Sequence, residues 1–225
     1  LIVLTFSIGT LIFAYSTVFL NHIVEAFLWF LTFFIVYKHS NKFKQMLLSG
    51  ILVGFCATVG LTTFFWVIVL LIYIVTKRGK LLPFLGGLLL GCLPLFIYNF
   101  SITKSLLFIY WFIDRKIWVG ALRNVTTLFT VSTPLAKIIF QPDLSYLLHV
   151  FILPSNGLFI YSPILIVGLI GILYEIVKNS KHMRKEASII LLLFLMLLFS
   201  LYDVNYGFSF GPRHLVPIIP FLIIG

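Results

Sequence analysis

The residues best suited to chemistry gather in one short stretch, residues 202–214, which is polar, aromatic and punctuated by glycine. Arg213 is permanently charged, and its fork of donors matches phosphate oxygens. Asp203 and His214 add a carboxylate and a titratable ring within eleven residues of each other, and Tyr206 lies between them. Composition alone favours a plain interfacial connector, with tyrosines and Arg213 at the lipid headgroups. The rest of the chain favours a site.

A second candidate pair, His22 and Glu25, lies three residues apart and therefore on one face of a helix. In a membrane helix an ionisable residue costs up to about 3 kcal/mol at the centre and is a functional candidate by default. The alternative is a structural pairing of Glu25 with His22 near the membrane surface, and the sequence leaves both open. No metal-ligand spacing, P-loop, serine nucleophile elbow or Rossmann fingerprint occurs in the sequence, so no metal site is predicted.

The elements that must position these residues are predicted to be membrane helices. The chain is 61% hydrophobic and 10% charged, against about 25% charged in soluble domains. Long apolar runs without period-two alternation indicate helices. We expect an all-α polytopic membrane protein, a single transmembrane domain over residues 1–225, with about seven to eight transmembrane or half-membrane helices. Residues 99–156 are too polar to span, and we predict an extracytoplasmic insertion with interfacial helices there.

Short basic loops set the predicted sidedness. Ten of the 16 lysines and arginines lie in residues 38–44, 77–80 and 178–185, and short basic loops are typically cytoplasmic. The His22–Glu25 pair and residues 202–214 then share the extracytoplasmic face. Because the loops account for the positive charge, no nucleic-acid partner is predicted.

Residues 46–75 have basic loops at both ends, so they must cross the membrane twice or not at all. These 30 residues cannot supply two spans of about 20 residues each. We predict two short helices hinged near residues 60–63 and shielded by neighbours, since broken helices need protein or a water-filled cavity around the freed backbone groups. The alternative is a single tilted span with one basic loop outside. By contrast, residues 1–20 are long and apolar enough to form one span.

Two glycine pairs, Gly50 with Gly54 and Gly87 with Gly91, each place small residues on one helical face. Such pairs let two backbones approach closely in a membrane. We therefore predict helix packing, not function, at these positions.

Three segments carry a family pattern in chain order. They read Gly9-Thr10-x4-Tyr15-Ser16-x5-His22, Pro154-x2-Gly157-Leu158-Phe159-x-Tyr161-Ser162-Pro163 and Gly207-x-Ser209-x-Gly211-Pro212-Arg213-x3-Pro217-x2-Pro220. These segments, together with Tyr98-Asn99, resemble bacterial and archaeal membrane glycosyltransferases of the GT-C superfamily, the relatives of the dolichyl-phosphate-mannose protein mannosyltransferases. The resemblance covers most of the chain, and the last segment is the most specific.

The resemblance implies a hexosyltransferase-type enzyme in a prokaryotic plasma membrane. Such enzymes move a sugar from a polyprenyl-phosphate carrier to an acceptor on the extracytoplasmic face, without a nucleotide. The implied partners are the lipid-linked sugar, membrane lipids and an acceptor that the sequence does not identify. No cofactor is certain, and a divalent metal is an open alternative. The family's catalytic carboxylate usually lies upstream of the position of Leu1, so we expect a fragment lacking the N-terminal part and inactive by itself.

The resemblance and the predicted sidedness together assign a substrate-binding set. Arg213 corresponds to a contact for the carrier phosphate, and Tyr206 stands where the family often has Trp, so it could stack on a sugar. The catalytic residue stays unassigned. The predicted substrate-binding residues are Arg213, His214, Tyr206, Asp203, His22 and Glu25.

Two alternatives belong to other classes. In a secondary transporter or lipid-carrier flippase, Glu25 would be the coupling site and the broken pair of helices over residues 46–75 would be the gate. In a non-catalytic assembly subunit, the scaffold would persist without the chemistry. An extracytoplasmic acidic pair upstream of Leu1 would favour the transferase, and inverted repeats would favour the transporter.

Overall fold

The computed structural model describes residues 2–18, 21–60, 62–103, 151–152, 157–178, 186–192, 195 and 213–224. This part of the chain is helical and contains no strand, which confirms the all-α prediction for these residues. Residues 186–192 are also helical. The remaining elements are α1 (Ile2–Ile8), α2 (Leu11–Thr17), α3 (Asn21–His39), α4 (Phe43–Val59), α5 (Thr63–Thr76), α6 (Leu81–Thr103), α10 (Leu158–Tyr161), α11 (Leu165–Val177), the 3-10 helix η3 (Arg213–Ile218) and α13 (Ile219–Ile224).

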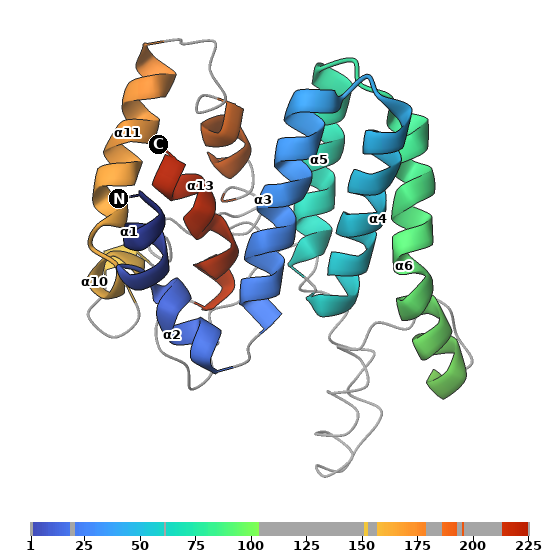
Figure 1. The fold of residues 1–225 in the computed structure, drawn as a ribbon, viewed down its shortest axis with the longest axis horizontal. Helices are drawn as coiled ribbons and strands as arrows, with labels where there is room; N and C mark the ends of the chain where they lie inside the picture. The colour runs from blue at the N-terminus through green and yellow to red at the C-terminus, as the bar shows by residue number, and fades with distance from the viewer. Residues whose placement is uncertain are drawn as a thin grey trace, which may run out of the picture.

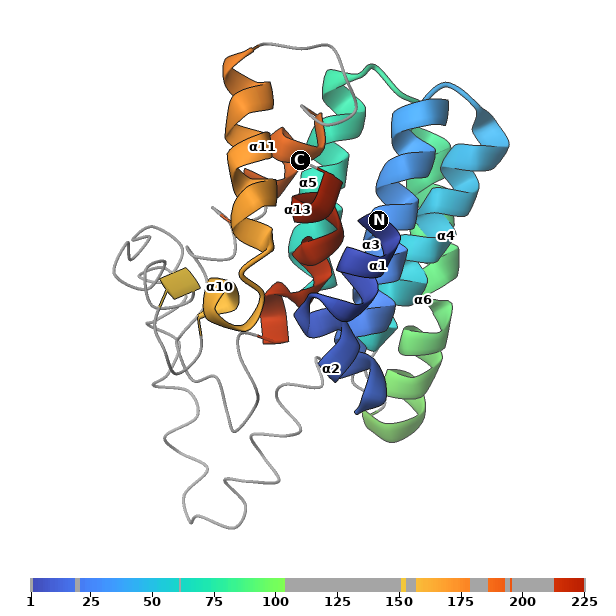
Figure 2. The same ribbon diagram turned by 60° about the vertical axis from the view of Figure 1, so that its left-hand side comes forward.

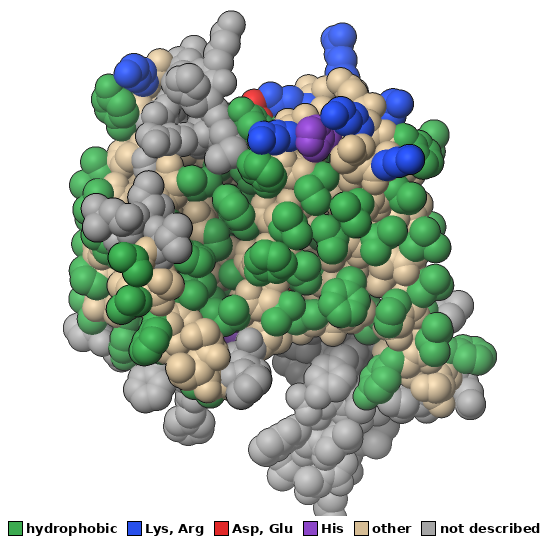
Figure 3. Space-filling view, in the orientation of Figure 1, with side chains coloured by type: hydrophobic (Ala, Val, Ile, Leu, Met, Phe, Trp, Pro, Cys, Tyr) green, Lys and Arg blue, Asp and Glu red, His purple; other side chains and the backbone are tan. Residues whose placement is uncertain are grey.

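Helices α3 to α6 run alternately up and down, side by side (Figure 1). The loops after α3 and after α5 therefore lie at one end, and the α4–α5 break lies at the other. Lysine and arginine side chains gather at the first end, above a face covered by hydrophobic side chains (Figure 3). We call these the basic end and the distal end.

The predicted division of residues 46–75 is confirmed. Helices α4 and α5 have 17 and 14 residues, or about 25 and 21 Å at 1.5 Å per residue. Between them, Gly60 is extended, with φ −161° and ψ 145°, and its N–H donates to Cys56 O. The predicted shielding holds for one side of the pair: Val53 and Trp66 are buried, whereas Phe55 and Phe64 are exposed.

The glycine pairs bring α4 and α6 into backbone contact, as predicted. A Cβ on Gly50 would lie 2.1 Å from Phe84 O, and one on Gly54 would lie 2.4 Å from Leu88 O. From the other side, a Cβ on Gly91 would lie 2.2 Å from Ile51 O. Only glycine permits this approach, and the two helices pack along their length.

The C-terminal elements pack on the other side of α3. Helix α13 contacts both α11 and α3, and η3 contacts α3; Figures 1 and 2 show α13 beside α11 from both directions. Gly168 of α11 allows this contact, because a Cβ there would lie 2.0 Å from Leu222 O. Helix α3 thus joins the α4–α6 group to the C-terminal group.

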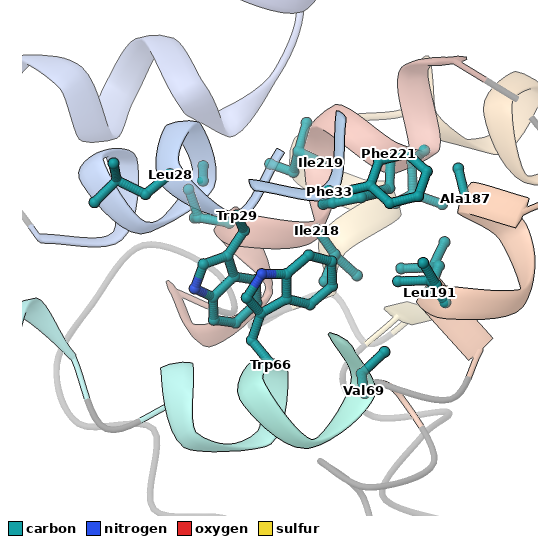
Figure 4. Close-up of a cluster of buried hydrophobic side chains, with 14 of the residues drawn as sticks. Leu28, Trp29, Phe33, Trp66, Val69, Ala187, Leu191, Ile218, Ile219 and Phe221 are labelled. Carbon is teal, nitrogen blue, oxygen red and sulfur yellow. The ribbon is translucent and has the colours of Figure 1, made fainter. Parts of the chain in front are cut away.

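A stacked tryptophan pair forms the centre of the core (Figure 4). Trp29 of α3 and Trp66 of α5 are fully buried and nearly parallel, with ring centroids 5.1 Å apart. Each indole donates to a threonine of the opposite helix: Trp29 Nε1 to Thr63 Oγ1 and Trp66 Nε1 to Thr32 Oγ1, both at 3.2 Å. Because buried indole N–H groups need acceptors, these bonds fix the register between α3 and α5.

Glu186 contacts the end of α5 at the basic end. Its carboxylate accepts hydrogen bonds from Tyr73 Oη and Lys77 Nζ at the end of α5. The lysine that pairs with Glu186 therefore belongs to residues 77–80. Residues 77–80 and Glu186, which follows residues 178–185, therefore lie together at the basic end.

The expectation of a single span over residues 1–20 is wrong. The chain forms two seven-residue helices there, α1 and α2, separated at Gly9 and Thr10. Thr10 caps α2 by accepting from Ile12 N–H, and Leu11 N–H donates to Ser162 Oγ at 2.9 Å. The backbone groups freed by the break are satisfied by these side chains, which hydropathy alone does not reveal.

By length and apolar composition, one helix among the described residues is able to cross a membrane, at Leu81–Ser101. The outward faces of α6 and α11 carry exposed apolar side chains, including Leu89, Leu93 and Ile170. Helix α6 continues to Thr103, so the start of the predicted insertion, residues 99–156, is helical. Apart from that start and residues 151–152, the insertion lies outside the described residues.

Candidate functional site

The carboxylate of Glu25 lies in the second turn of α3 and is fully buried. Its Oε2 accepts a hydrogen bond from Thr62 Oγ1 at 3.1 Å and lies 3.2 Å from His22 Nδ1. Its Oε1 is buried and has no hydrogen-bond partner among the described residues. The sequence left open whether Glu25 is deep or near the surface, and the structure places it inside the protein.

The α4–α5 break is built around this carboxylate. A Cβ on Gly60 would lie 1.3 Å from Glu25 Oε1, so the carboxylate occupies the space that a side chain at residue 60 would need. The extended backbone of Gly60 is open to any residue, and the requirement for glycine is therefore one of space. Asn21 Nδ2 donates to Val59 O at 2.8 Å, which ties the start of α3 to the last residue of α4.

His22 is held on two sides. Its Nδ1 faces the Glu25 carboxylate, and its ring meets the ring of Tyr15 edge to face, with centroids 6.4 Å apart and planes at 80°. In the neutral tautomer with the proton on Nδ1, that N–H donates to Glu25 and Nε2 becomes a proton acceptor. A carboxylate that fixes an imidazole in this way sets both its tautomer and its orientation.

The structure also brings together parts of two family-like segments. Thr10 and Tyr15 belong to α2 and its cap, and Ser162 bonds the backbone of Leu11, as described above. Tyr15 in turn touches His22. A continuous set of contacts therefore connects residue 162 through α2 to the His22–Glu25 pair at the distal end.

The other predicted site residues are described in part. Arg213 is the first residue of η3, which packs against α3, the helix that carries His22 and Glu25. The backbone of Arg213 and His214 is described, and their side chains are not. Asp203 and Tyr206 lie outside the described residues.

The sequence analysis did not identify three residues that belong to the site. Thr62 donates to Glu25, Gly60 makes room for its Oε1, and Asn21 joins the helix ends. The only available signal was the small, polar interruption at residues 60–63 inside an apolar run. Among the described residues, no group of three or more His, Cys, Asp or Glu side chains is placed to hold a metal ion.

The arrangement is thus an oriented imidazole backed by a buried carboxylate, at the distal end of the helices. A comparison of the chain with protein-family models, curated proteins and solved structures finds no match. The chemistry is therefore argued from the residues themselves.

Proposed function

We propose that the protein is a membrane glycosyltransferase that moves a sugar from a polyprenyl-phosphate carrier to an acceptor on the extracytoplasmic face. The observation that carries this proposal is the buried His22–Glu25–Thr62 cluster at the distal end, on the helix against which η3 packs. The proposal also rests on the resemblance of three segments to the GT-C superfamily.

The proposed placement is polytopic, in a prokaryotic plasma membrane. Helix α6 supplies a span of 21 residues, Leu81–Ser101, and α3 has 19 residues and is largely apolar. The shorter α4 and α5 would lie within the bilayer, with protein around their break. The basic end would face the cytoplasm, because short loops rich in Lys and Arg stay inside. The His22–Glu25–Thr62 cluster would then open toward the outer leaflet.

In the proposed reaction, an acceptor hydroxyl oxygen attacks C1 of the sugar. The bond from C1 to the phosphate oxygen breaks, the polyprenyl phosphate leaves, and a base takes the hydroxyl proton. Arg213 would neutralise the phosphate as charge develops on it, with His214, Tyr206 and Asp203 beside it. The base is not among the residues that this proposal assigns.

Glu25 acts through His22 in this scheme. With no exposed surface, its carboxylate cannot touch a substrate directly. It is a positioning residue that fixes the imidazole, and His22 is the pocket-lining group. We expect Glu25→Gln to lower kcat and to leave KM for the carrier nearly unchanged, because a tautomer is disturbed and not a lipid contact.

The central test is Arg213→Lys in the full-length protein, reconstituted in liposomes with radiolabelled polyprenyl-phosphate sugars. Loss of a charge-assisted bidentate contact should reduce transfer by about ten- to a hundredfold. The matched control is Lys44→Arg at the basic end, which should transfer normally. Wild-type transfer by Arg213→Lys would remove Arg213 from the site.

A secondary transporter or lipid-carrier flippase is the second candidate. It is favoured by one observation: Oε1 of Glu25, which has no hydrogen-bond partner in the described part of the chain, lies at a break between two short helices. Transporters build ion and substrate sites at such breaks. In that case Glu25→Gln would abolish movement of the cargo across the liposome membrane, and Arg213→Lys would not. If Arg213→Lys is the more damaging of the two substitutions, the result supports the transferase.

A further inference from the structure

An apolar groove lies between α5 and α6 near the basic end. Its volume is about 450 Å³, and five of the six residues that line it are apolar. The groove exists because α6 packs along α4 through its glycines and makes few contacts with α5, although the two helices are consecutive. It is lined by Leu71, Ile72, Val75, Thr76, Leu81 and Leu85.

Two exposed cations lie at the head of this groove. The loop that joins α5 to α6 contributes Lys77, Arg78 and Lys80, directly between the residues that line the groove. Lys77 is bound to Glu186. In the described part of the chain, no carboxylate forms an ion pair with Arg78 or Lys80.

The loop is held rigidly in the shape that presents these cations. Gly79 N–H donates to Ile74 O and Lys80 N–H donates to Ser40 O, both at 2.8 Å. Arg78 has a φ of 51°, the left-handed region that residues with a side chain rarely adopt. Such strained positions persist where the surroundings fix them, and they cluster at functional sites.

We propose that the groove, with Arg78 and Lys80, binds an anionic phospholipid of the cytoplasmic leaflet. The phosphate would lie on the two cations, and the first part of an acyl chain would lie between α5 and α6. The groove follows about one turn of each helix, or roughly 6 Å, so it holds only the chain nearest the headgroup. An apolar wall that ends at Arg78 and Lys80, which form no ion pair within the described part of the chain, matches a phospholipid, since basic pockets between membrane helices bind anionic headgroups.

This proposal rests on the membrane placement given above and not on glycosyl transfer. The site is at the basic end, away from the His22–Glu25 pair at the distal end, so the polyprenyl-phosphate sugar is not its ligand. The groove is therefore assigned an anionic phospholipid of the cytoplasmic leaflet, and the polyprenyl-phosphate sugar belongs to the opposite leaflet.

The test measures lipid retention by native mass spectrometry of the full-length protein, released from detergent containing dioleoylphosphatidylglycerol or dioleoylphosphatidylcholine. We expect the wild type to retain phosphatidylglycerol in preference. Arg78→Gly and Lys80→Gln should each weaken its retention about fivefold, as expected for one basic residue near an anionic surface. Arg78→Gly also relieves the strained φ, so it should fold at least as stably as the wild type. Ile72→Trp should fill the groove and displace the lipid without removing charge.

The matched control is Lys44→Gln, which removes an exposed lysine from another basic loop. It should retain phosphatidylglycerol as the wild type does. Equal retention of the two lipids by the wild type, or equal losses in Lys44→Gln and Arg78→Gly, would overturn the proposal. A protein that prefers phosphatidylglycerol and transfers no sugar would keep this proposal and lose the glycosyltransferase. A protein that transfers sugar and shows no preference between the two lipids would lose this proposal and keep the glycosyltransferase.

Discussion

Two adjacent glycines of α6, Gly86 and Gly87, should respond in opposite ways to the same substitution. A Cβ on Gly86 would meet nothing within 4 Å. A Cβ on Gly87 would lie 2.1 Å from Leu47 O and 2.9 Å from Ile51 N, both in the backbone of α4. We therefore expect Gly86→Ala to stabilise the protein and Gly87→Ala to destabilise it.

The magnitudes follow from helix propensity and from overpacking. Alanine in place of glycine inside a helix raises the free energy of unfolding by about 1 kcal/mol, and both variants share this gain. In Gly87→Ala the methyl group meets a carbonyl oxygen at 2.1 Å, where ordinary contact begins at 3.4 Å, so α4 and α6 must separate. Forced overpacking costs about 1–3 kcal/mol, occasionally more. Separation also weakens the contacts at Gly50, Gly54 and Gly91, so we use the upper half of that range. The two variants should then differ by roughly 2–3 kcal/mol.

The assay is reversible unfolding of the two variants and the wild type in one detergent, followed by circular dichroism. Gly86→Ala and Gly87→Ala are the same substitution at adjacent positions of one helix, so each variant is the control for the other. Gly50→Ala and Gly54→Ala, on the facing helix, should behave like Gly87→Ala. If Gly87→Ala were as stable as Gly86→Ala, the close approach of α4 and α6 at this point would be refuted.

Three further changes test the core and its polar contacts by the same unfolding measurement. Gly60→Ala should displace the Glu25 carboxylate and lose hydrogen bonds worth about 1.5–3 kcal/mol each, and this penalty should shrink in a Glu25→Ala background. Trp66→Ala should cost about 3–5 kcal/mol through the cavity it leaves, and Trp66→Phe should cost less, so equal losses would contradict the stacked core. Glu186→Gln should cost at most about 1 kcal/mol, because the side chain of its partner Lys77 is 42% exposed, and a larger loss would show a stronger link.

Much of the α3–α6 arrangement could be predicted because charge constrains it. If the basic residues at both ends of residues 46–75 lie on one side of a membrane, the segment crosses an even number of times. Its length is too short for two full spans, so a broken pair is expected. The division at Gly9 and Thr10 could not be predicted in the same way. It depends on Ser162, which supplies an acceptor to Leu11 from 151 positions away in the chain, and a hydropathy pattern contains no information about such a partner.

The candidate site, too, could be predicted only in part. The pairing of His22 with Glu25 follows from their i, i+3 spacing and is confirmed by the 3.2 Å contact. The depth of Glu25 does not follow from spacing, because it is set by the packing of α3 against the α4–α5 break. Thr62 reaches the carboxylate from 37 positions away, and the importance of Gly60 appears only once Oε1 is seen beside it.

The two proposed functions make different physical demands on Oε1 of Glu25. A buried acceptor left without a partner costs about 1–3 kcal/mol, and none of the described residues donates to Oε1. If Glu25 positions His22, both Oε2 contacts persist through turnover, and Oε1 stays closed off by Gly60. If Glu25 couples an ion, Gly60 must move away so that the ion can reach Oε1, and the bond from Asn21 to Val59 O must open with it. Hydrogen exchange at residues 59–63 therefore separates the two: slow exchange that is unaffected by ions fits a fixed positioning carboxylate, whereas ion-dependent protection requires a break that opens.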